Sequence, residues 1–192
     1  MSVTYSSSEL HQAAKSLKEG AVLLHRADTI WGLICDATSK EGVAKIGKIK
    51  ARPVGMSYII LVKDEAMIER FVREVPEVSW DIVENAEDPI TIIYPEGMGL
   101  APGVCAEDKS IAIRVVKEAD TQRLIQFLGR PIVSTSANLS GQPSALTLNE
   151  MDPSILNQID GVISDEGRPK KANKASAIIK IGLHGEVNII RS

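Results

Sequence analysis

Cysteine, histidine and long apolar runs are scarce in this sequence, and each shortage excludes a class of protein. The two cysteines, Cys35 and Cys105, are too few for the disulfide framework of a small secreted domain. The three histidines, His11, His25 and His184, show no spacing typical of a zinc site. No apolar run is long enough to cross a membrane, and the polar N-terminus lacks the apolar segment of a secretory signal. We therefore expect a cytoplasmic protein with no metal site of its own and no membrane contact.

The composition and charge are those of an ordinary globular domain. Apolar residues make up 44% of the 192 residues and charged residues 24%, which is typical of a chain that folds around a core. The length is that of one domain, so we expect a single domain over residues 1–192. The formal net charge of -3 provides no overall basic field that would attract nucleic acid.

Apolar runs that predict strands alternate with segments of helical periodicity. We predict strands over residues 21–24, 58–62, 90–94, 110–116, 131–133, 161–164, 176–181 and 186–190. We predict helices that begin at Ser7 or Ser8, Ser39, Asp64 and Pro76, and helices over 119–128 and 149–159. Residues 25–32, 134–143 and 165–174 are interpreted as loops. This interleaving predicts one α/β domain, and two successive strands near the C-terminus predict a mixed sheet.

The densest group of small polar side chains follows the apolar run at 131–133. It contains Ser134, Thr135, Ser136 and Asn138, at a predicted strand end, which is where open α/β sheets bind ligands. An ordinary solvated turn is the alternative interpretation.

Cationic side chains elsewhere could complete an anion site with these hydroxyls. Lys50 and Arg52 stand two residues apart near a predicted helix end, and Arg grips phosphate or carboxylate with a fork of donors. Arg114 lies within an apolar strand, where burial is costly unless the charge is paired or meets an anion. A salt bridge across the sheet explains Arg114 equally well.

The sequence contains no local catalytic signature. G-x-S-x-G, Walker A and G-x-G-x-x-G motifs are all absent. What remains is positive charge and hydrogen-bond donors without a protein nucleophile. Such a site suits phosphoryl or nucleotidyl transfer, in which the substrate supplies the nucleophile.

Five short motifs, in their order and spacing, resemble the YrdC/TsaC family of threonylcarbamoyl-AMP synthases from about residue 9 to residue 191. The motifs are DTIWGL at 28–33 with CDAT at 35–38, KARP at 50–53, PIT at 89–91, AIRV at 112–115 and STSANLSG at 134–141. The K-x-R and S-x-N signature of the family is matched by Lys50, Arg52, Ser136 and Asn138.

The resemblance implies a fold and a reaction. The fold is a twisted mixed β-sheet flanked by helices, with a concave, largely positive cavity. The reaction condenses L-threonine, bicarbonate and ATP, with Mg²⁺, into threonylcarbamoyl-adenylate and pyrophosphate. A partner transferase then modifies tRNA, and tRNA or double-stranded RNA is a further implied contact.

The resemblance also implies roles for individual residues. Lys50 and Arg52 would be the catalytic cations that hold the phosphates of ATP. The remaining implied nucleotide-binding residues are Ser110, Ser136, Asn138, Ser176 and Arg191. The implied threonine-binding residues are Thr29, Trp31, Thr91 and Arg114, of which Arg114 would pair with the carboxylate of threonine.

Several positions depart from the family pattern, and they cluster on the threonine side. Arg26 and Ala27 replace a Pro-Thr pair, Ile34 replaces glycine, and Met56 stands near a common Lys-Pro or Asn-Pro. These departures motivate two alternatives. One is an RNA-binding family member that has lost catalysis, and the other is a related carbamoyl-adenylating enzyme with another acceptor.

Overall fold

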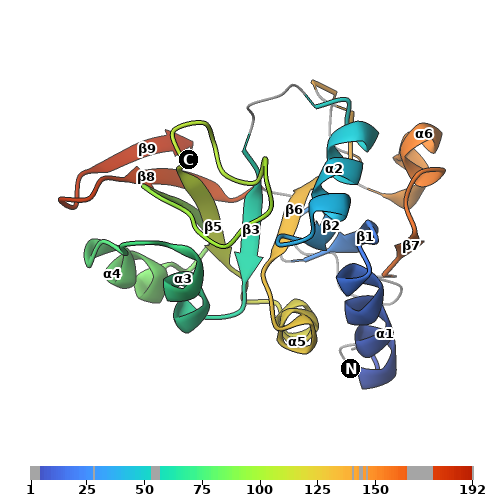
Figure 1. The fold of residues 1–192 in the computed structure, drawn as a ribbon, viewed down its shortest axis with the longest axis horizontal. Helices are drawn as coiled ribbons and strands as arrows, with labels where there is room; N and C mark the ends of the chain where they lie inside the picture. Colours follow the sequence, from blue (N-terminus) through green and yellow to red (C-terminus); the bar gives the residue numbers. More distant parts are fainter. Residues whose placement is uncertain are drawn as a thin grey trace.

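A computed structural model describes residues 5–27, 29–52, 57–139, 141–142, 145, 147–163 and 175–191. Within this part of the chain, nine strands form one sheet in the order β7-β1-β2-β6-β3-β5-β4-β8-β9 (Figure 1). The strands are β1 (Leu23–Arg26), β2 (Trp31–Asp36), β3 (Ile59–Val62), β4 (Ile90–Tyr94), β5 (Ile111–Val115), β6 (Ile132–Ser136), β7 (Gly161–Val162), β8 (Ala177–Ile181) and β9 (Val187–Arg191). The helices are α1 (Ser7–Lys18), α2 (Lys40–Ile49), α3 (Glu65–Phe71), α4 (Val78–Asn85), α5 (Ala119–Leu128), the 3₁₀ turn η1 (Leu148–Glu150) and α6 (Pro153–Leu156).

The sheet is mixed, as the sequence predicted. β3 pairs in parallel with β5, β4 with β8 and β1 with β7. The remaining neighbours pair antiparallel. Helices and strands interleave along the chain, which confirms the α/β class.

Helix starts follow local capping chemistry. The Ser39 hydroxyl accepts the Gly42 N–H at 3.1 Å at the start of α2, and the Asp64 carboxylate accepts the Met67 N–H at 3.0 Å at the start of α3. Both starts were predicted. The cap of α1 is Ser6 instead of Ser7 or Ser8, because Ser6 forms a capping box with Glu9.

Two predicted loops contain strands. Residues 25–32 include the end of β1 and the start of β2, which pair as a hairpin with His25 opposite Gly32. The buried His25 ring bonds the Thr121 hydroxyl at 2.7 Å, so its polar atom has a partner inside the core. Likewise, β6 continues through Ser136, because β2 pairs with it along its length and β3 pairs with its first half. Pairing with β2, and for Ser134 with β3 as well, outweighs the turn preference of serine.

The predicted helix over 149–159 is divided into η1 and α6, and Pro153 begins α6 at the position where a missing N–H costs nothing. The predicted loop over 165–174 lies outside the described residues.

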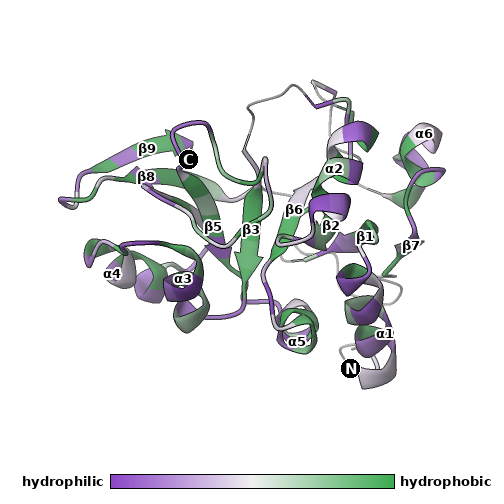
Figure 2. Cartoon of the chain, in the orientation of Figure 1, coloured by the Kyte–Doolittle hydropathy of each residue, from purple (hydrophilic) through white to green (hydrophobic). Residues whose placement is uncertain are grey.

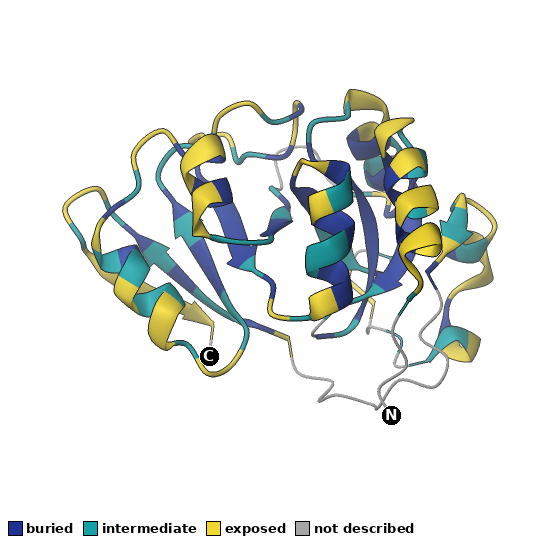
Figure 3. Ribbon diagram, turned by 90° about the horizontal axis from the view of Figure 1, so that it is seen from below, coloured by how far each residue is buried: buried dark blue, intermediate teal, exposed yellow. Residues whose placement is uncertain are grey.

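The register places polar and apolar side chains on opposite faces of the sheet. Partners across a pair of strands point to the same side, so Ser134 and Ser136 share a face with Arg114. The other face carries apolar residues such as Val133, Ile60 and Ile113, which are buried. Figure 2 shows the strands as largely hydrophobic and the helices as two-sided. Figure 3 shows helices whose outer surfaces are exposed in front of buried strands.

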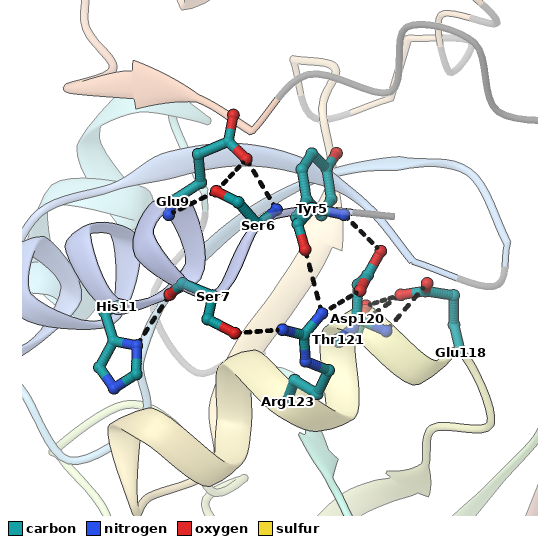
Figure 4. A network of polar contacts seen from close by, with 9 residues as sticks. All are labelled: Tyr5, Ser6, Ser7, Glu9, His11, Glu118, Asp120, Thr121 and Arg123. Carbon is teal, nitrogen blue, oxygen red and sulfur yellow. Dashed lines mark hydrogen bonds and ion pairs between the residues drawn. The ribbon is translucent and has the colours of Figure 1, made fainter. Parts of the chain in front are cut away.

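A polar network fixes the start of α1 against α5 (Figure 4). The Arg123 guanidinium donates to the Tyr5 carbonyl at 3.0 Å, the Ser7 hydroxyl at 2.8 Å and the Asp120 carboxylate at 3.0 Å. The buried Asp120 carboxylate also accepts the Tyr5 N–H at 3.1 Å. No helix in the described part of the chain is long and apolar enough to cross a membrane.

Candidate functional site

A cavity of about 260 Å³ opens on the polar face of the sheet. Residues from β2, β6, β5 and the β8–β9 region meet there with the segment that follows α2. The described lining consists of Thr29, Ile30, Trp31, Gly32, Arg52, Ser57, Tyr58, Ile59, Arg114, Ser134, Thr135, Ser136, Ala175, Ser176 and Arg191.

Arg52 reaches the cavity because the chain turns sharply after α2. Ala51 has a φ of 46°, in the left-handed region, which ends the helix and redirects the following residue. The Arg52 guanidinium lies 4.4 Å from the centre of the Tyr58 ring and donates to the Ser57 carbonyl. These contacts hold a partly buried cation at the wall of the cavity.

Lys50 is more deeply buried, with 2% of its surface exposed. Its ammonium group donates to the Ser136 carbonyl at 2.6 Å and to the Asn138 carbonyl at 2.5 Å. Burial, and then the neighbouring Arg52 charge, lower the pKa of Lys50 to about 8. Lys50 therefore ties the end of α2 to the end of β6, so the K-x-R and S-x-N segments meet although they lie 86 residues apart.

Arg191 and Ser176 form the far wall. The Arg191 guanidinium donates from Nε at 3.2 Å and from Nη2 at 2.7 Å to the Ser176 carbonyl. The Ser176 hydroxyl lies 2.7 Å from that of Thr91, which is buried behind it. Arg114, 4% exposed, lines the cavity from β5.

The residues implied by the family resemblance fall into three groups. Those that line the cavity are Thr29, Trp31, Arg52, Arg114, Ser136, Ser176 and Arg191. Lys50 and Thr91 are not lining residues themselves, but each hydrogen-bonds to one. Lys50 contacts the Ser136 carbonyl, and the Thr91 hydroxyl contacts the Ser176 hydroxyl. Ser110 and Asn138 are not among the described lining residues. The Ser110 hydroxyl donates to the Asp108 carboxylate at 2.5 Å, and the Asn138 amide donates to the Gln142 carbonyl at 2.6 Å. The individual roles of all these residues stay predictions.

Ser134 belongs to the polar group that was named from the sequence, but no individual role was assigned to it. It has the same orientation as Ser136 because they are two residues apart on one strand, a signal that a correct strand prediction would have supplied. Gly32 was not singled out from the sequence. Gly32 lines the cavity because it lacks a side chain. A Cβ there would lie 3.1 Å from the Thr135 carbonyl oxygen and 3.2 Å from the Ser134 hydroxyl.

One of the departures from the family pattern, Ile34, is opposite the lining residue Ser134 in the pairing of β2 with β6. Another, Ala27, follows β1 and packs against the core. Met56 lies outside the described residues.

The electrostatics of the cavity favour an anionic ligand. Arg52, Arg114 and Arg191 surround hydroxyl groups, and the described lining contains no carboxylate. Hydroxyls and guanidinium groups together bind phosphate and carboxylate oxygens. Within the described residues, no group of three or more His, Cys, Asp or Glu side chains is placed to hold a metal ion.

A mixed sheet with an arginine-rich and hydroxyl-rich cavity on one face defines an anion-binding α/β domain. Residues 15–192 match the family model of the Sua5/YciO/YrdC proteins, described as telomere recombination, and the chain belongs to this family. It is 32% identical to a threonylcarbamoyl-AMP synthase of Stenotrophomonas maltophilia over 160 residues, covering 82% of this chain and 86% of that one. It is 31% identical to the Pseudoalteromonas translucida protein of the same name over 183 residues, covering 94% and 96%.

Solved structures of this family share the fold. The chain superposes on a P. abyssi Sua5 double variant with a TM-score of 0.86 at 22% identity, covering all of this chain and 60% of that one. For P. abyssi Sua5 complexed with L-threonine the TM-score is 0.83 at 23% identity, and the match covers 94% of this chain and 53% of that one. The chain thus spans little more than half of Sua5. For E. coli YciO the TM-score is 0.80 at 20% identity, and the match covers 100% of this chain and 95% of that one.

Proposed function

We propose that this protein is an L-threonylcarbamoyladenylate synthase, a nucleotidyltransferase that condenses L-threonine, bicarbonate and ATP. The observation that carries the proposal is the convergence of Arg52, Arg114 and Arg191 with Ser136 and Ser176 on one cavity. Relatives that carry the name threonylcarbamoyl-AMP synthase match over most of their length, which supports the same reaction.

The cavity offers two kinds of anion contact. Arg52 and Arg191 bind the ATP phosphates, where negative charge grows as pyrophosphate leaves, and Arg114 pairs with the threonine carboxylate. The hydroxyls of Ser136 and Ser176 donate hydrogen bonds to the nucleotide. Because the Arg52 and Arg191 guanidinium groups are held in place by their own contacts, they stabilise the transition state without reorganising.

The substrates supply the reacting groups. The threonine amine adds to bicarbonate with loss of water and forms a carbamate. A carbamate oxygen then attacks the α-phosphorus of ATP, the bond to the bridging oxygen breaks, and pyrophosphate leaves. Lys50 donates hydrogen bonds to the Ser136 and Asn138 carbonyls and so positions the chain at the end of β6. This role is additional to its predicted contact with the phosphates.

The described lining offers no carboxylate to hold a resident magnesium ion. Mg²⁺ therefore enters this proposal as part of MgATP, bound to the phosphates that it accompanies. We further propose that the product passes to a tRNA threonylcarbamoyl transferase, which makes tRNA the final acceptor.

Pyrophosphate release tests the proposal. The purified chain is supplied with ATP, Mg²⁺ and labelled bicarbonate, with and without L-threonine. We expect release that depends on threonine. Release with another amino acid instead would support the enzyme with a different acceptor. If no amino acid produced release while tRNA was retained at moderate salt, the chain would be an RNA-binding protein without this catalysis.

A further inference from the structure

A second cavity, of about 330 Å³, lies on the face of the sheet opposite the candidate site. Side chains two residues apart on a strand share a face. On β5, Ile113 and Val115 line this cavity, whereas Arg114 between them lines the candidate site. On β4 the lining residues also alternate, and they are Ile90, Ile92 and Tyr94. The two cavities have no described lining residue in common, so this cavity is a separate one.

Helices α3 and α4 complete the wall of this cavity and leave its space unfilled. Ile68 of α3 and Val83 of α4 line it together with the strand residues. The large apolar side chains of α4 are all only partly buried, and they are Val78, Trp80, Ile82 and Val83. A helix packed closely on a sheet buries its apolar stripe, so this pattern indicates room beneath α4. The volume of the cavity is within the range of small-molecule sites.

Tyr94 supplies a polar atom inside the cavity. It is fully buried, and its hydroxyl forms no hydrogen bond of ordinary length with a described residue. The Ser79 hydroxyl is close by, but it donates its proton to the Pro76 carbonyl at 2.7 Å and so can only accept. The Tyr94 oxygen therefore lacks a donor, and a buried oxygen without one is costly. A ligand that donates a hydrogen bond would satisfy it.

Carboxylates stand at the mouth of the cavity. The three that line it are exposed and form no ion pair with a described residue, and they are Glu65, Glu84 and Asp88. Burial raises the pKa of Tyr94 to about 12, the Ser79 hydroxyl opposes this rise, and the Glu65 carboxylate adds to it. This effect of Glu65 places its negative charge near the Tyr94 oxygen. The cavity thus combines a missing hydrogen-bond donor with unpaired negative charge.

The two lysines of the lining do not offset these carboxylates. The Lys63 ammonium lies 2.9 Å from the Asp64 carboxylate, which cancels its charge, and Lys117 donates to the Ala86 carbonyl. One lysine therefore stands against three carboxylates. This balance favours a cation in the cavity over an anion.

We propose that this cavity binds a small organic amine, with its apolar body against the isoleucine and valine side chains and its ammonium group between Glu65 and Tyr94. The ammonium donates to both oxygens. It thereby supplies the donor that the Tyr94 oxygen lacks and the positive charge that the carboxylates lack. A carboxylate ligand would supply neither. The proposal does not depend on the synthase activity, because the two cavities lie on opposite faces of the sheet.

Three probes with the same phenyl body and different charges test the proposal. They are phenethylamine, phenethyl alcohol and hydrocinnamate, which are positive, neutral and negative. Titrations of the whole chain are followed by NMR of isoleucine methyl groups, in which Ile92 and Ile113 report on this cavity and Ile30 and Ile59 on the candidate site. We expect the amine to shift the Ile92 and Ile113 signals and to bind about tenfold more tightly than the alcohol, with hydrocinnamate weakest.

Two variants test the polar contacts. Tyr94→Phe should weaken amine binding about two- to tenfold, the range for one hydrogen bond. Glu65→Gln should weaken it about two- to fivefold, because this carboxylate is exposed, and should leave the alcohol unaffected. Glu69→Gln, one turn further along α3 and also exposed, is the matched control and should bind the amine like the wild-type protein.

Thermal unfolding followed by circular dichroism checks that each variant is folded, and Glu65→Gln with the three probes suffices if Tyr94→Phe is not. An amine that leaves the Ile92 and Ile113 signals unchanged at every concentration overturns the proposal. So does an alcohol or hydrocinnamate that binds as tightly as the amine. An equal loss of amine binding in Glu65→Gln and Glu69→Gln would also overturn it.

Discussion

Arg52 and Lys50 stand two residues apart at the end of α2, yet their cationic groups have different surroundings. The left-handed turn at Ala51 separates them. Arg52 reaches the wall of the cavity, whereas the Lys50 ammonium is buried against the Ser136 and Asn138 carbonyls. The K-x-R motif thus supplies two different groups. Arg52 is placed to bind ligand, and Lys50 orders the end of β6 next to the cavity.

At the residue scale, Arg52→Ala tests the ligand-binding part. We expect ATP binding to weaken by roughly 10–150-fold, because a hydrogen bond to a charged group contributes about 1.5–3 kcal/mol. Stability should fall by less than about 1 kcal/mol, because Arg52 is only partly buried. Titration calorimetry with ATP and urea unfolding measure the two effects.

Arg73→Ala is the control, since Arg73 is 64% exposed and pairs with Glu96, and neither residue is among the described lining of the cavity. A loss of stability in Arg52→Ala as large as that of a core deletion, about 2–5 kcal/mol, would make Arg52 a structural residue.

At the element scale, the pairing of β2 with β6 shapes the floor of the cavity. Gly32 lies opposite Ser136 in that register, and its missing side chain leaves the Ser134 hydroxyl accessible. The polar face of the sheet therefore depends on a glycine in one strand and on serines in the next.

Gly32→Ala should narrow this floor. The added methyl group would lie 3.1 Å from the Thr135 carbonyl oxygen and must displace a neighbour. We expect ligand affinity to fall about tenfold, which equals ~1.4 kcal/mol, within the range for overpacking. Calorimetry with ATP and threonine measures the change. Gly47→Ala, a helix position with ordinary space around it, serves as the comparison. Unchanged affinity in Gly32→Ala would show that ligand does not reach β2.

At the scale of the whole molecule, buried Lys50 couples stability to pH. A lysine in the unfolded chain has a pKa near 10.5, whereas burial lowers the pKa of Lys50 to about 8. Below pH 8 both states hold the proton and burial of the charge costs stability. Between about pH 8 and 10.5 the unfolded chain binds more protons, so the free energy of unfolding rises with pH.

We therefore expect the wild-type protein to gain stability relative to Lys50→Met across this range. The gain should approach a few kcal/mol, at ~1.4 kcal/mol for each unit of pKa. Urea unfolding at several pH values measures it, with Lys48→Met on the exposed side of α2 as the control. Parallel stability curves for wild type and Lys50→Met would contradict the coupling.

Local signals decided which elements were predictable. The starts of α2 and α3 follow from Ser39 and Asp64, whose side chains cap the next turn, and the bounds of β4 follow from an apolar run. β2 and the second half of β6 were missed, because Gly32, Ser134 and Ser136 favour turns locally and become strand residues only when β2 and β6 pair with each other.

The sequence by itself determined the α/β class, most element bounds and the family, because apolar periodicity, capping residues and ordered motifs are local properties of the chain. It also named Arg52, Arg114 and Arg191 as residues of one site. The tertiary structure alone decided that they share a cavity, that Lys50 faces inward and that Gly32 and Ser134 form the floor. Strand register and the turn at Ala51 set those positions, and register depends on pairing between segments far apart in the chain.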